Sequence, residues 1–413
     1  MKVKVKGIYS TAISKILLDA GYEIVEAGRL ISAKYGTSSG QSDVEISDLP
    51  SKEGILIKGS SAKRVAESIR EKLSNAIQID KSKGRIYLSI IKGIDESNKN
   101  IIVESPDGEG IIDMRNFWGY AKPGSKILVQ QKGRNSKYII LTTQIRFFGK
   151  DCVLITNGFN KMSNRIRSDE IRSKLMKVTK EANIKNKGIL WKASAARKSE
   201  EDLKNEINEL LKLEEKIKKE FEQYDSPRIL YEGEQEIALI FDSDTKFKLD
   251  EIRKEVAETI KGHHLLKSAG YKEIVDILEN MGINSTDIFE KISKTLEQYG
   301  PSVKKKYEII LIGINGINKK ITGRVEEINE NVISIKNRNI YEIDKKNQII
   351  RKKSNENEII LTHSVEIFPN FARAIYLGIA KNKEEALSIL DSNKSVLGNL
   401  YETIKSKVDK LWS

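Results

Sequence analysis

Arg85-Ile-Tyr-Leu-Ser-Ile-Ile91 is the first of five short segments that the sequence predicts to be β-strands. The turn Ser105-Pro-Asp-Gly-Glu-Gly110 combines a proline, which fixes φ, with glycines, which admit positive φ. The other four predicted strands lie in the same stretch of the chain, at 100–104, 110–113, 126–131 and 137–141. Short strands separated by turn residues are typical of a small all-β module, so this stretch predicts a five-stranded barrel.

The segments on both sides of the predicted barrel alternate between strand and helix. Before it, strands are expected at 2–9, 22–26, 54–58 and 75–79, with helices that begin at Ser10 and Ser60. After it, the alternation resumes with Val153-Leu-Ile-Thr156 and continues to a long helix that begins at Ser199. The sequence therefore predicts a multidomain α/β protein, whose α/β domain is interrupted by an inserted barrel of the OB-fold type.

The C-terminal third of the chain predicts further domains. Residues 246–300 have a helical pattern broken by glycines, and short alternating strands follow Tyr299-Gly-Pro301. The predicted organisation is the first part of the α/β domain at 1–82, the OB-fold module at 83–145, the second part of the α/β domain with helices at 146–300, a small β domain at 301–369 and a helical tail at 370–413.

Charge is unevenly distributed along the chain. The whole sequence has 72 Lys and Arg against 59 Asp and Glu, a net charge of +13. Between Tyr120 and Lys180 there are fourteen basic and three acidic residues together with five aromatic ones, whereas Ser199–Asp225 has ten acidic and five basic residues. Cations neutralise phosphates, and flat rings stack on unpaired bases. The pattern therefore predicts binding of single-stranded nucleic acid.

The residues expected to bind nucleic acid fall into two groups. The cations predicted to contact the backbone are Lys122, Lys126, Lys132, Arg134, Arg146, Arg165 and Arg167. The rings predicted to stack on bases are Tyr87, Phe117, Trp118 and Tyr120. Phe117 and Trp118 have an alternative interpretation, in which they close one end of the barrel as part of its core.

Candidate catalytic groups are few. Asp242-Ser-Asp244 places two carboxylates on one side of an extended segment, where they are candidates to share a Mg²⁺ ion; the alternative is an ordinary turn and helix cap. His263 and His264 are adjacent and would point about 100° apart on a helix, so we expect them to pack near a helix start. His363 is expected to be structural. Residues 301–413 have no clustered carboxylates that would favour a phosphohydrolase.

Composition excludes several other classes of protein. The one cysteine, Cys152, rules out an internal disulfide framework or a thiolate zinc site. No apolar run approaches the length needed to span a membrane, and the start of the chain does not resemble a signal sequence. We expect a soluble, cytoplasmic protein without membrane association, and an oligomer is compatible with the sequence.

Several stretches, in this order, resemble the ribonuclease E/G family, and most closely its archaeal branch of AU-rich-RNA-binding proteins. These stretches are Gly7-Ile-Tyr-Ser-Thr-Ala-Ile-Ser-Lys-Ile-Leu-Leu-Asp-Ala-Gly-Tyr22, Gly124-Ser-Lys-Ile-Leu-Val-Gln-Gln131, Ile139-Ile-Leu-Thr-Thr-Gln-Ile145, Gly188-Ile-Leu-Trp-Lys-Ala-Ser194 and Gly262-His-His-Leu-Leu-Lys267. The resemblance covers roughly residues 1–300. It implies an RNase H-like α/β domain interrupted by an OB-fold module, binding to AU-rich single-stranded or loop RNA, and a role in maturation or decay of ribosomal RNA precursors.

The sequence also departs from the bacterial members of that family. Those members bind magnesium through two aspartates, one of them within an Ile-Asp-Val-Asn-Ser run that is absent here, and Asp242 and Asp244 do not match it. Two functions are therefore expected as alternatives. The first is an endoribonuclease, and the second is an RNA-binding module or RNA chaperone that does not cleave.

Overall fold

The computed structural model describes residues 1–412, except 83, 118–119, 135–137, 183, 234, 283–299, 315–317 and 354–357. Trp118 therefore lies outside the described residues, and only the backbone of Arg134 is described. The chain forms two compact units. Unit 1 consists of residues 1–81 and 236–413, and unit 2 consists of residues 82–235, inserted between two strands of unit 1.

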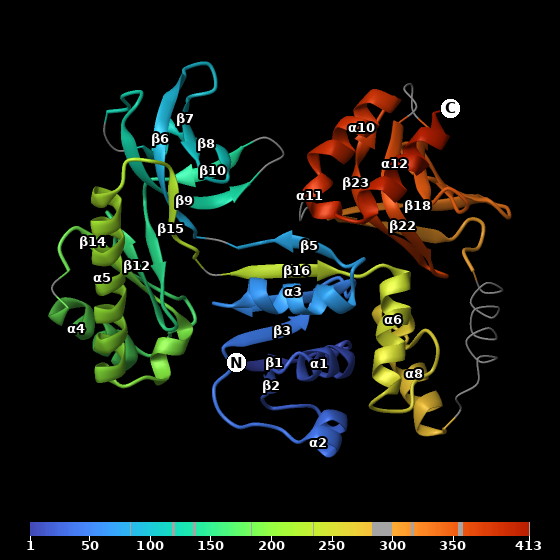
Figure 1. Cartoon of the computed structure of the whole chain (residues 1–413), viewed down its shortest axis with the longest axis horizontal. Coiled ribbons are helices and arrows are strands. Elements are labelled where there is room, and N and C mark those ends of the chain that lie inside the picture. The colour runs from blue at the N-terminus through green and yellow to red at the C-terminus, as the bar shows by residue number, and fades with distance from the viewer. Residues whose placement is uncertain are drawn as a thin grey trace. The chain divides into compact units, whose positions relative to one another are not determined.

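Unit 1 is built on a mixed six-stranded sheet with the order β2-β1-β3-β4-β16-β5 (Figure 1). Strand β1 pairs in parallel with β2 on one side and β3 on the other, whereas β16 is antiparallel to β4 and β5. The strands are β1 (Lys2–Val5), β2 (Glu23–Ile24), β3 (Val44–Asp48), β4 (Gly54–Gly59), β5 (Ile77–Asp80) and β16 (Glu236–Ile240). The chain thus returns to this sheet at residue 236, whereas the predicted boundaries placed the return at 146.

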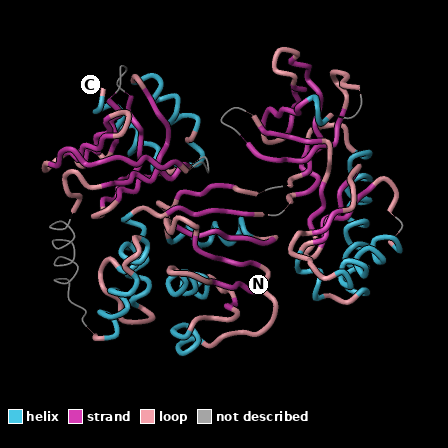
Figure 2. Tube along the Cα trace, turned by 180° about the vertical axis from the view of Figure 1, so that it is seen from behind, coloured by secondary structure: helices cyan, strands magenta, loops and turns pink. Residues whose placement is uncertain are grey.

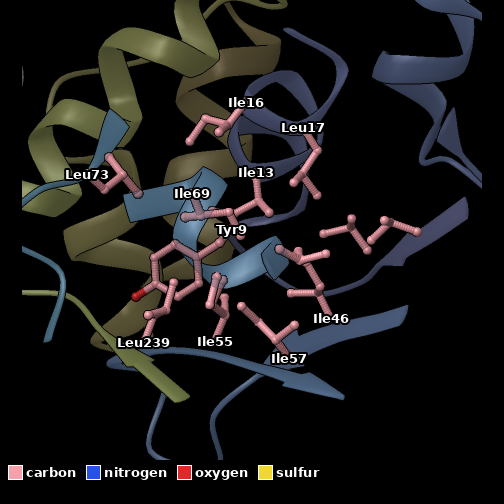
Figure 3. Close-up of a cluster of buried hydrophobic side chains, with 14 of the residues drawn as sticks. Tyr9, Ile13, Ile16, Leu17, Ile46, Ile55, Ile57, Ile69, Leu73 and Leu239 are labelled. Atoms are coloured by element: carbon pink, nitrogen blue, oxygen red, sulfur yellow. The ribbon is translucent and has the colours of Figure 1, made fainter. Parts of the chain in front are cut away.

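Side chains alternate between the two faces of this sheet, as the pleat requires. Ile237 and Leu239 of β16 join the core beneath helices α1, α3 and α6, while Ala238 and Ile240 join the core on the opposite face. These helices are α1 (Ser10–Asp19), α3 (Ala62–Lys72) and α6 (Ser243–Lys254). Figure 3 shows Ile13 and Leu17 of α1 above the strand residues of this core. The short helix α2 (Arg29–Tyr35) precedes β3.

A closed seven-stranded barrel and three helices follow in unit 1 (Figures 1 and 2). The barrel strands are β17 (Lys306–Gly313), β18 (Lys319–Ile328), β19 (Val332–Lys336), β20 (Ile340–Asp344), β21 (Ile349–Lys353), β22 (Glu358–Ile367) and β23 (Phe371–Ala380). The helices are α10 (Lys383–Ser392), α11 (Lys394–Leu397) and α12 (Leu400–Leu411). Two further helices, α7 (His263–Ser268) and α8 (Lys272–Asn280), follow α6.

Strand β23 differs from the predicted helical tail. It pairs in parallel with β17 and closes the barrel. Its side chains are buried on both sides, because Ala372 and Ala374 face the barrel core while Ile375 and Leu377 join the core shared with α10 and α12. An apolar run buried on both faces lacks the alternation that marks a strand in the sequence.

Unit 2 begins with the predicted five-stranded barrel, and the structure confirms it. Strands follow the order β6-β7-β8-β10-β9, and a β6–β9 pairing closes the ring. Its strands are β6 (Ile86–Asp95), β7 (Asn100–Ser105), β8 (Gly108–Asp113), β9 (Lys126–Arg134) and β10 (Ile139–Thr142), with the short helix η1 (Met114–Asn116) between β8 and β9. This closed barrel is compatible with an OB-fold.

The second half of unit 2 is a four-stranded sheet with two helices packed on it. Ser199 and Asp202 form a capping box at the start of the long helix α5, where the sequence predicted a helix start. The elements are β11 (Arg146–Phe148), β12 (Cys152–Thr156), β13 (Lys161–Met162), α4 (Asp169–Glu181), β14 (Lys187–Trp191), η2 (Ala193–Arg197), α5 (Glu200–Gln223) and β15 (Arg228–Tyr231), and β15 pairs with β6 of the barrel. Among the described helices of both units, none is long and apolar enough to cross a membrane.

Candidate nucleic-acid interface

Two hollows lie next to each other on unit 2. The larger one, called here cavity 1, has a volume of about 470 Å³. Its walls come from the start of β6, from η1, and from β9, β10 and β11. The lining residues are Gly84, Arg115, Asn116, Gln130, Gln131, Lys132, Thr142, Gln144, Arg146 and Phe148.

Gln130 holds the inner wall of cavity 1 in place. Its buried side-chain amide donates to the carbonyls of Gly84 (2.9 Å) and Arg146 (2.7 Å), and its Oε1 accepts from the Arg146 backbone N–H (2.8 Å). Gly84 has φ +78°, and a Cβ there would lie 2.9 Å from the Phe148 ring. The close approach of backbone and ring explains why a glycine occupies this position.

Cavity 1 is basic. Lys132 and Arg146, both predicted to contact nucleic acid, line it together with Arg115. Arg115 pairs with Asp113 at 2.6 Å, and this hydrogen-bonded pair lowers the pKa of Asp113 to about 2. The Arg146 guanidinium is 3.4 Å from Oε1 of Gln144. Three exposed cations beside the half-buried ring of Phe148 give this wall both phosphate-binding and stacking groups.

Cavity 2 is smaller, about 300 Å³, and it carries the predicted aromatic residues. Phe117 and Tyr120 both line it. Tyr120 is 89% exposed, whereas Phe117 is half-buried and packs against the barrel core. This contact agrees with the interpretation of Phe117 as part of the core, and a stacking role for its ring stays a prediction. The cavity is also lined by Ile91, Ser125, Lys126, Ile127, Leu128, Thr143 and Asn157.

The two cavities adjoin through neighbouring residues on two segments. Asn116 lines cavity 1 and Phe117 lines cavity 2, while Thr142 and Gln144 line cavity 1 and Thr143 lines cavity 2. The Thr143 hydroxyl donates to the Asn116 carbonyl at 3.0 Å and ties the two segments together. The result is one continuous basic and aromatic surface, which we call the barrel track.

Other predicted cations lie outside the two cavities. Lys122 is exposed in the loop before β9. Arg165 and Arg167 are exposed on either side of the buried Ile166, just before α4, and line neither cavity.

Tyr87 is a correction to the predicted stacking residues. Its side chain is fully buried in the barrel core, and its hydroxyl donates to Asp107 (2.9 Å) or Gln131 (2.8 Å). Burial raises the pKa of this phenol, so the hydroxyl keeps its proton. A buried ring has no free face for a base, because alternate residues of a barrel strand point inward.

Lys126 lines cavity 2 and also has partners within the protein, so its predicted contact with RNA stays a prediction. Its ammonium donates to the carbonyls of Phe221 and Glu222, both at 3.2 Å, and pairs with Asp225 at 3.2 Å. It also lies 5.3 Å from the centre of the Phe221 ring. Lys126 therefore binds the unpaired carbonyls at the C-terminal end of α5, where the helix dipole is negative.

The Asp242–Asp244 pair has the arrangement of a helix cap, the alternative that the sequence allowed. Asp242 is buried; its Oδ1 accepts from the Thr245 backbone N–H (2.8 Å), and its Oδ2 is 2.9 Å from Nε2 of His363. Burial opposes ionisation, but the hydrogen bonds from His363 and Thr245 outweigh it and lower the pKa of Asp242. Asp244 is exposed. These residues do not fit a shared Mg²⁺ site, and the described part of the chain has no cluster of three or more potential metal-binding side chains.

Sequence reasoning missed Arg115, Gln144 and Phe148. Arg115 lies five residues before the basic, aromatic run at 120–180, so a composition window that starts at Tyr120 excludes it. Phe148 lies inside that window, but the sequence does not show which of the neighbouring rings Phe147 and Phe148 faces the cavity. The pairing of β11 with β12 decides this, and it buries Phe147.

The fold and the barrel track together define a multidomain α/β protein with an inserted barrel that carries a basic, aromatic surface. The model of the ribonuclease E/G family matches residues 147–297. A protein named "Probable ribonuclease FAU-1" from Staphylothermus marinus is 30% identical over 345 residues, which cover 79% of this chain and 71% of that protein. The chain belongs to the ribonuclease E/G family, in its archaeal FAU-1 branch.

Two further relatives carry the same printed name. The Pyrococcus horikoshii protein is 32% identical over 281 residues, 65% of this chain and 58% of the relative. The Caldivirga maquilingensis protein is 29% identical over 329 residues, 76% of this chain and 67% of the relative. The chain thus spans about 58–67% of the length of these two relatives.

Proposed function

We propose that this protein binds RNA along the barrel track and is an endoribonuclease. The RNA class proposed is AU-rich, single-stranded or loop RNA, and the setting is maturation or decay of ribosomal RNA precursors in the cytoplasm. One observation carries the proposal: the two cavities adjoin. The rings of Phe117, Tyr120 and Phe148 therefore lie on the same surface as the cations Lys132 and Arg146.

This surface suits a single strand better than a duplex. Bases must be unpaired to stack on protein rings, and the rings of the barrel track line the two cavities. Cations on the same wall neutralise the phosphates between stacked bases. An OB-type module and an RNase H-like sheet are the fold assignments that this proposal uses, and the names of the relatives support the ribonuclease part.

A second candidate function is an RNA-binding module or chaperone that does not cleave. One observation favours it: Asp242 caps α6. In addition, the described residues contain no group of three or more His, Cys, Asp or Glu side chains that could hold a metal ion.

One assay separates the two candidates. The purified chain is incubated with a precursor ribosomal RNA in Mg²⁺, the metal that the resemblance suggests, and in EDTA, with Asp242→Asn/Asp244→Asn as a second protein. The endoribonuclease proposal predicts discrete cleavage products, and it predicts that the double variant still cleaves, because Asp242 is a cap. Tight RNA binding without cleavage under either condition would favour the non-catalytic candidate.

A further inference from the structure

The loop between β12 and β13, residues 157–160, carries an exposed phenylalanine. The loop follows β12, which pairs with β14 in the sheet of unit 2 (Figure 1). The side chain of Phe159 is 83% exposed, and among the aromatic side chains that the structure describes only Tyr120 is more exposed. A single apolar side chain on a surface is common and has no meaning by itself. Phe159 differs from such a residue in the support of its backbone and in its neighbours.

The backbone on both sides of Phe159 is fixed by contacts with β14 and the turn before it. The Asn157 backbone N–H donates to the carbonyl of Asn186 at 2.9 Å, and Oδ1 of Asn160 accepts from a backbone N–H of β14 at 2.9 Å. Gly188 packs directly against the loop, because a Cβ there would lie 2.4 Å from the Phe159 carbonyl oxygen. The ring is therefore presented to solvent from a defined backbone position.

The same loop forms part of the barrel track. Asn157 lines cavity 2 together with Phe117 and Tyr120, and its carbonyl accepts from the side-chain amide of Gln144 at 3.4 Å. Phe159 follows Asn157 by two residues, so their Cα atoms lie within about 7 Å of each other. The exposed ring is thus next to the cavity in which stacking of RNA bases is proposed.

Two hydrogen bonds hold the start of this loop against the segment that separates the barrel from β11. The Thr156 backbone N–H donates to the carbonyl of Ile145, and the Ile145 backbone N–H donates to the Thr156 hydroxyl, both at 2.9 Å. Ile145 lies between Gln144 and Arg146, which line cavity 1. The loop therefore keeps a fixed position relative to both cavities of the barrel track.

The surroundings of the ring favour a polyanion. Residues 152–168 contain no Asp or Glu, and Lys161, at the end of the loop, is exposed. Lys185 is also exposed and precedes Asn186, the residue whose carbonyl holds Asn157. Cations beside a free ring suit a phosphate next to a stacked base. Lysine is depleted in the centre of protein–protein interfaces, so these neighbours favour RNA over a protein partner.

We infer that Phe159 stacks on an unpaired base and extends the barrel track beyond cavity 2 onto the four-stranded sheet of unit 2. The inference rests on the RNA binding proposed above, and it adds a residue and the surface that a further nucleotide occupies. A ring on a fixed backbone loses little conformational freedom when a base stacks on it, so the gain from stacking is not offset by ordering of the loop.

The test compares three replacements of Phe159 in the full chain. Phe159→Ala removes the ring and should weaken binding of a short AU-rich single-stranded RNA about 5-fold or more. Phe159→Leu keeps an apolar side chain without a flat ring and should lose as much affinity, whereas Phe159→Trp keeps a ring and should bind as tightly as wild type. A Phe159→Leu variant with the affinity of wild type would show that the ring does not stack, and would overturn the inference.

A matched control comes from the same unit. Met176 of α4 is an exposed apolar side chain that lines neither cavity, so Met176→Ala should bind RNA as wild type does. Replacement of an exposed side chain leaves stability nearly unchanged, so denaturant unfolding should give the same midpoint for wild type and for every Phe159 variant.

Photocrosslinking provides a readout on the wild-type chain. Single-stranded RNAs that carry 5-iodouridine at each position in turn are irradiated while bound, and the crosslinked residue is identified by mass spectrometry. One position should crosslink to Phe159, and another position of the same RNA should crosslink to Phe117 or Tyr120. Crosslinks confined to the rings of the two cavities would overturn the inference.

Failure of this inference and failure of the proposed RNA binding give different results. If Phe159→Ala binds RNA as wild type does while Phe117→Ala/Tyr120→Ala binds more weakly, the RNA does not reach Phe159 and the barrel track stands. That result is also the one expected if the ring serves a protein partner. If the wild-type chain does not bind single-stranded RNA, the proposed RNA binding and this inference fail together.

Discussion

The hydroxyl of Thr143 donates a hydrogen bond to the carbonyl of Asn116, 3.0 Å away, at the point where the two cavities of the barrel track meet. This bond connects the segment after β10 to the end of η1. It therefore links the wall that carries Arg146 to the wall that carries Phe117, so cations and rings are held on one surface by the fold itself.

The cations of cavity 1 should contribute separately to RNA affinity. We expect Arg146→Ala and Lys132→Ala each to weaken binding of a single-stranded RNA and to lower the slope of log affinity against log salt by about 0.7, because each removes one phosphate contact. Fluorescence anisotropy titrations at several salt concentrations measure both quantities. Lys219→Ala on the acidic helix α5 is the matched control, since Lys219 is exposed and lies outside both cavities. An unchanged salt slope in both cavity variants would contradict the prediction.

Tyr87 should act in stability and not in binding. Tyr87→Phe removes a buried hydroxyl that bonds to Asp107 or Gln131, and we expect unit 2 to lose about 1 kcal/mol of unfolding free energy. Denaturant unfolding followed by fluorescence gives this value. RNA affinity measured where the variant is fully folded should equal that of wild type; a loss comparable to that of a surface ring would mean that Tyr87 reaches the RNA.

Replacing Lys126 should lower stability more than RNA affinity, and replacing Lys122 should do the reverse. Lys126→Met removes the cation at the C-terminal end of α5, so we expect a loss of about 0.3–1 kcal/mol of unfolding free energy with little effect on RNA affinity. Lys122→Ala changes an exposed side chain and should leave stability unaltered while weakening RNA binding. Thermal unfolding and fluorescence anisotropy on the same samples measure stability and RNA affinity for both variants. A Lys126→Met variant that keeps its stability but binds RNA more weakly would identify Lys126 as a phosphate contact.

Cys152 should be unreactive in the folded protein. Burial, reinforced by the nearby negative charge of Glu206, raises the pKa of this thiol to about 12, so the reactive thiolate is scarce at neutral pH. A colorimetric thiol reagent should label the native chain very slowly and label one thiol per chain at once in guanidinium chloride. Rapid labelling without denaturant would show that β12 opens readily.

The sequence was sufficient for the features that depend on local pattern. Five strands bounded by turn residues predicted the barrel, and Ser199 predicted the start of α5. It was insufficient where pairing between distant segments decides the outcome. Strand β23 has no alternation because both of its faces are buried, and the return of the chain at β16 depends on pairing with β4 and β5, which precede it by more than a hundred and fifty residues.

The residues of the candidate site were also predictable where local composition decides and unpredictable where distant contacts decide. Composition identified the basic, aromatic run and so located Lys132, Arg146 and Tyr120, which line the cavities, whereas Phe117 was predicted from the outer face of the barrel. Composition does not reveal which side of a strand a residue occupies, so Tyr87 was included although it points inward. It also does not reveal that a cation such as Lys126 has a partner some hundred residues away in α5.

The measurement that tests the central claim most directly is the affinity of Phe117→Ala/Tyr120→Ala for a short AU-rich single-stranded RNA. If RNA stacks in cavity 2, each lost ring costs about 1–3 kcal/mol, so the double variant should bind at least about 30-fold more weakly than wild type. Tyr35→Ala, which removes an exposed ring from α2 in unit 1, should bind as wild type does. Equal affinity of the double variant and wild type would contradict RNA binding along the barrel track.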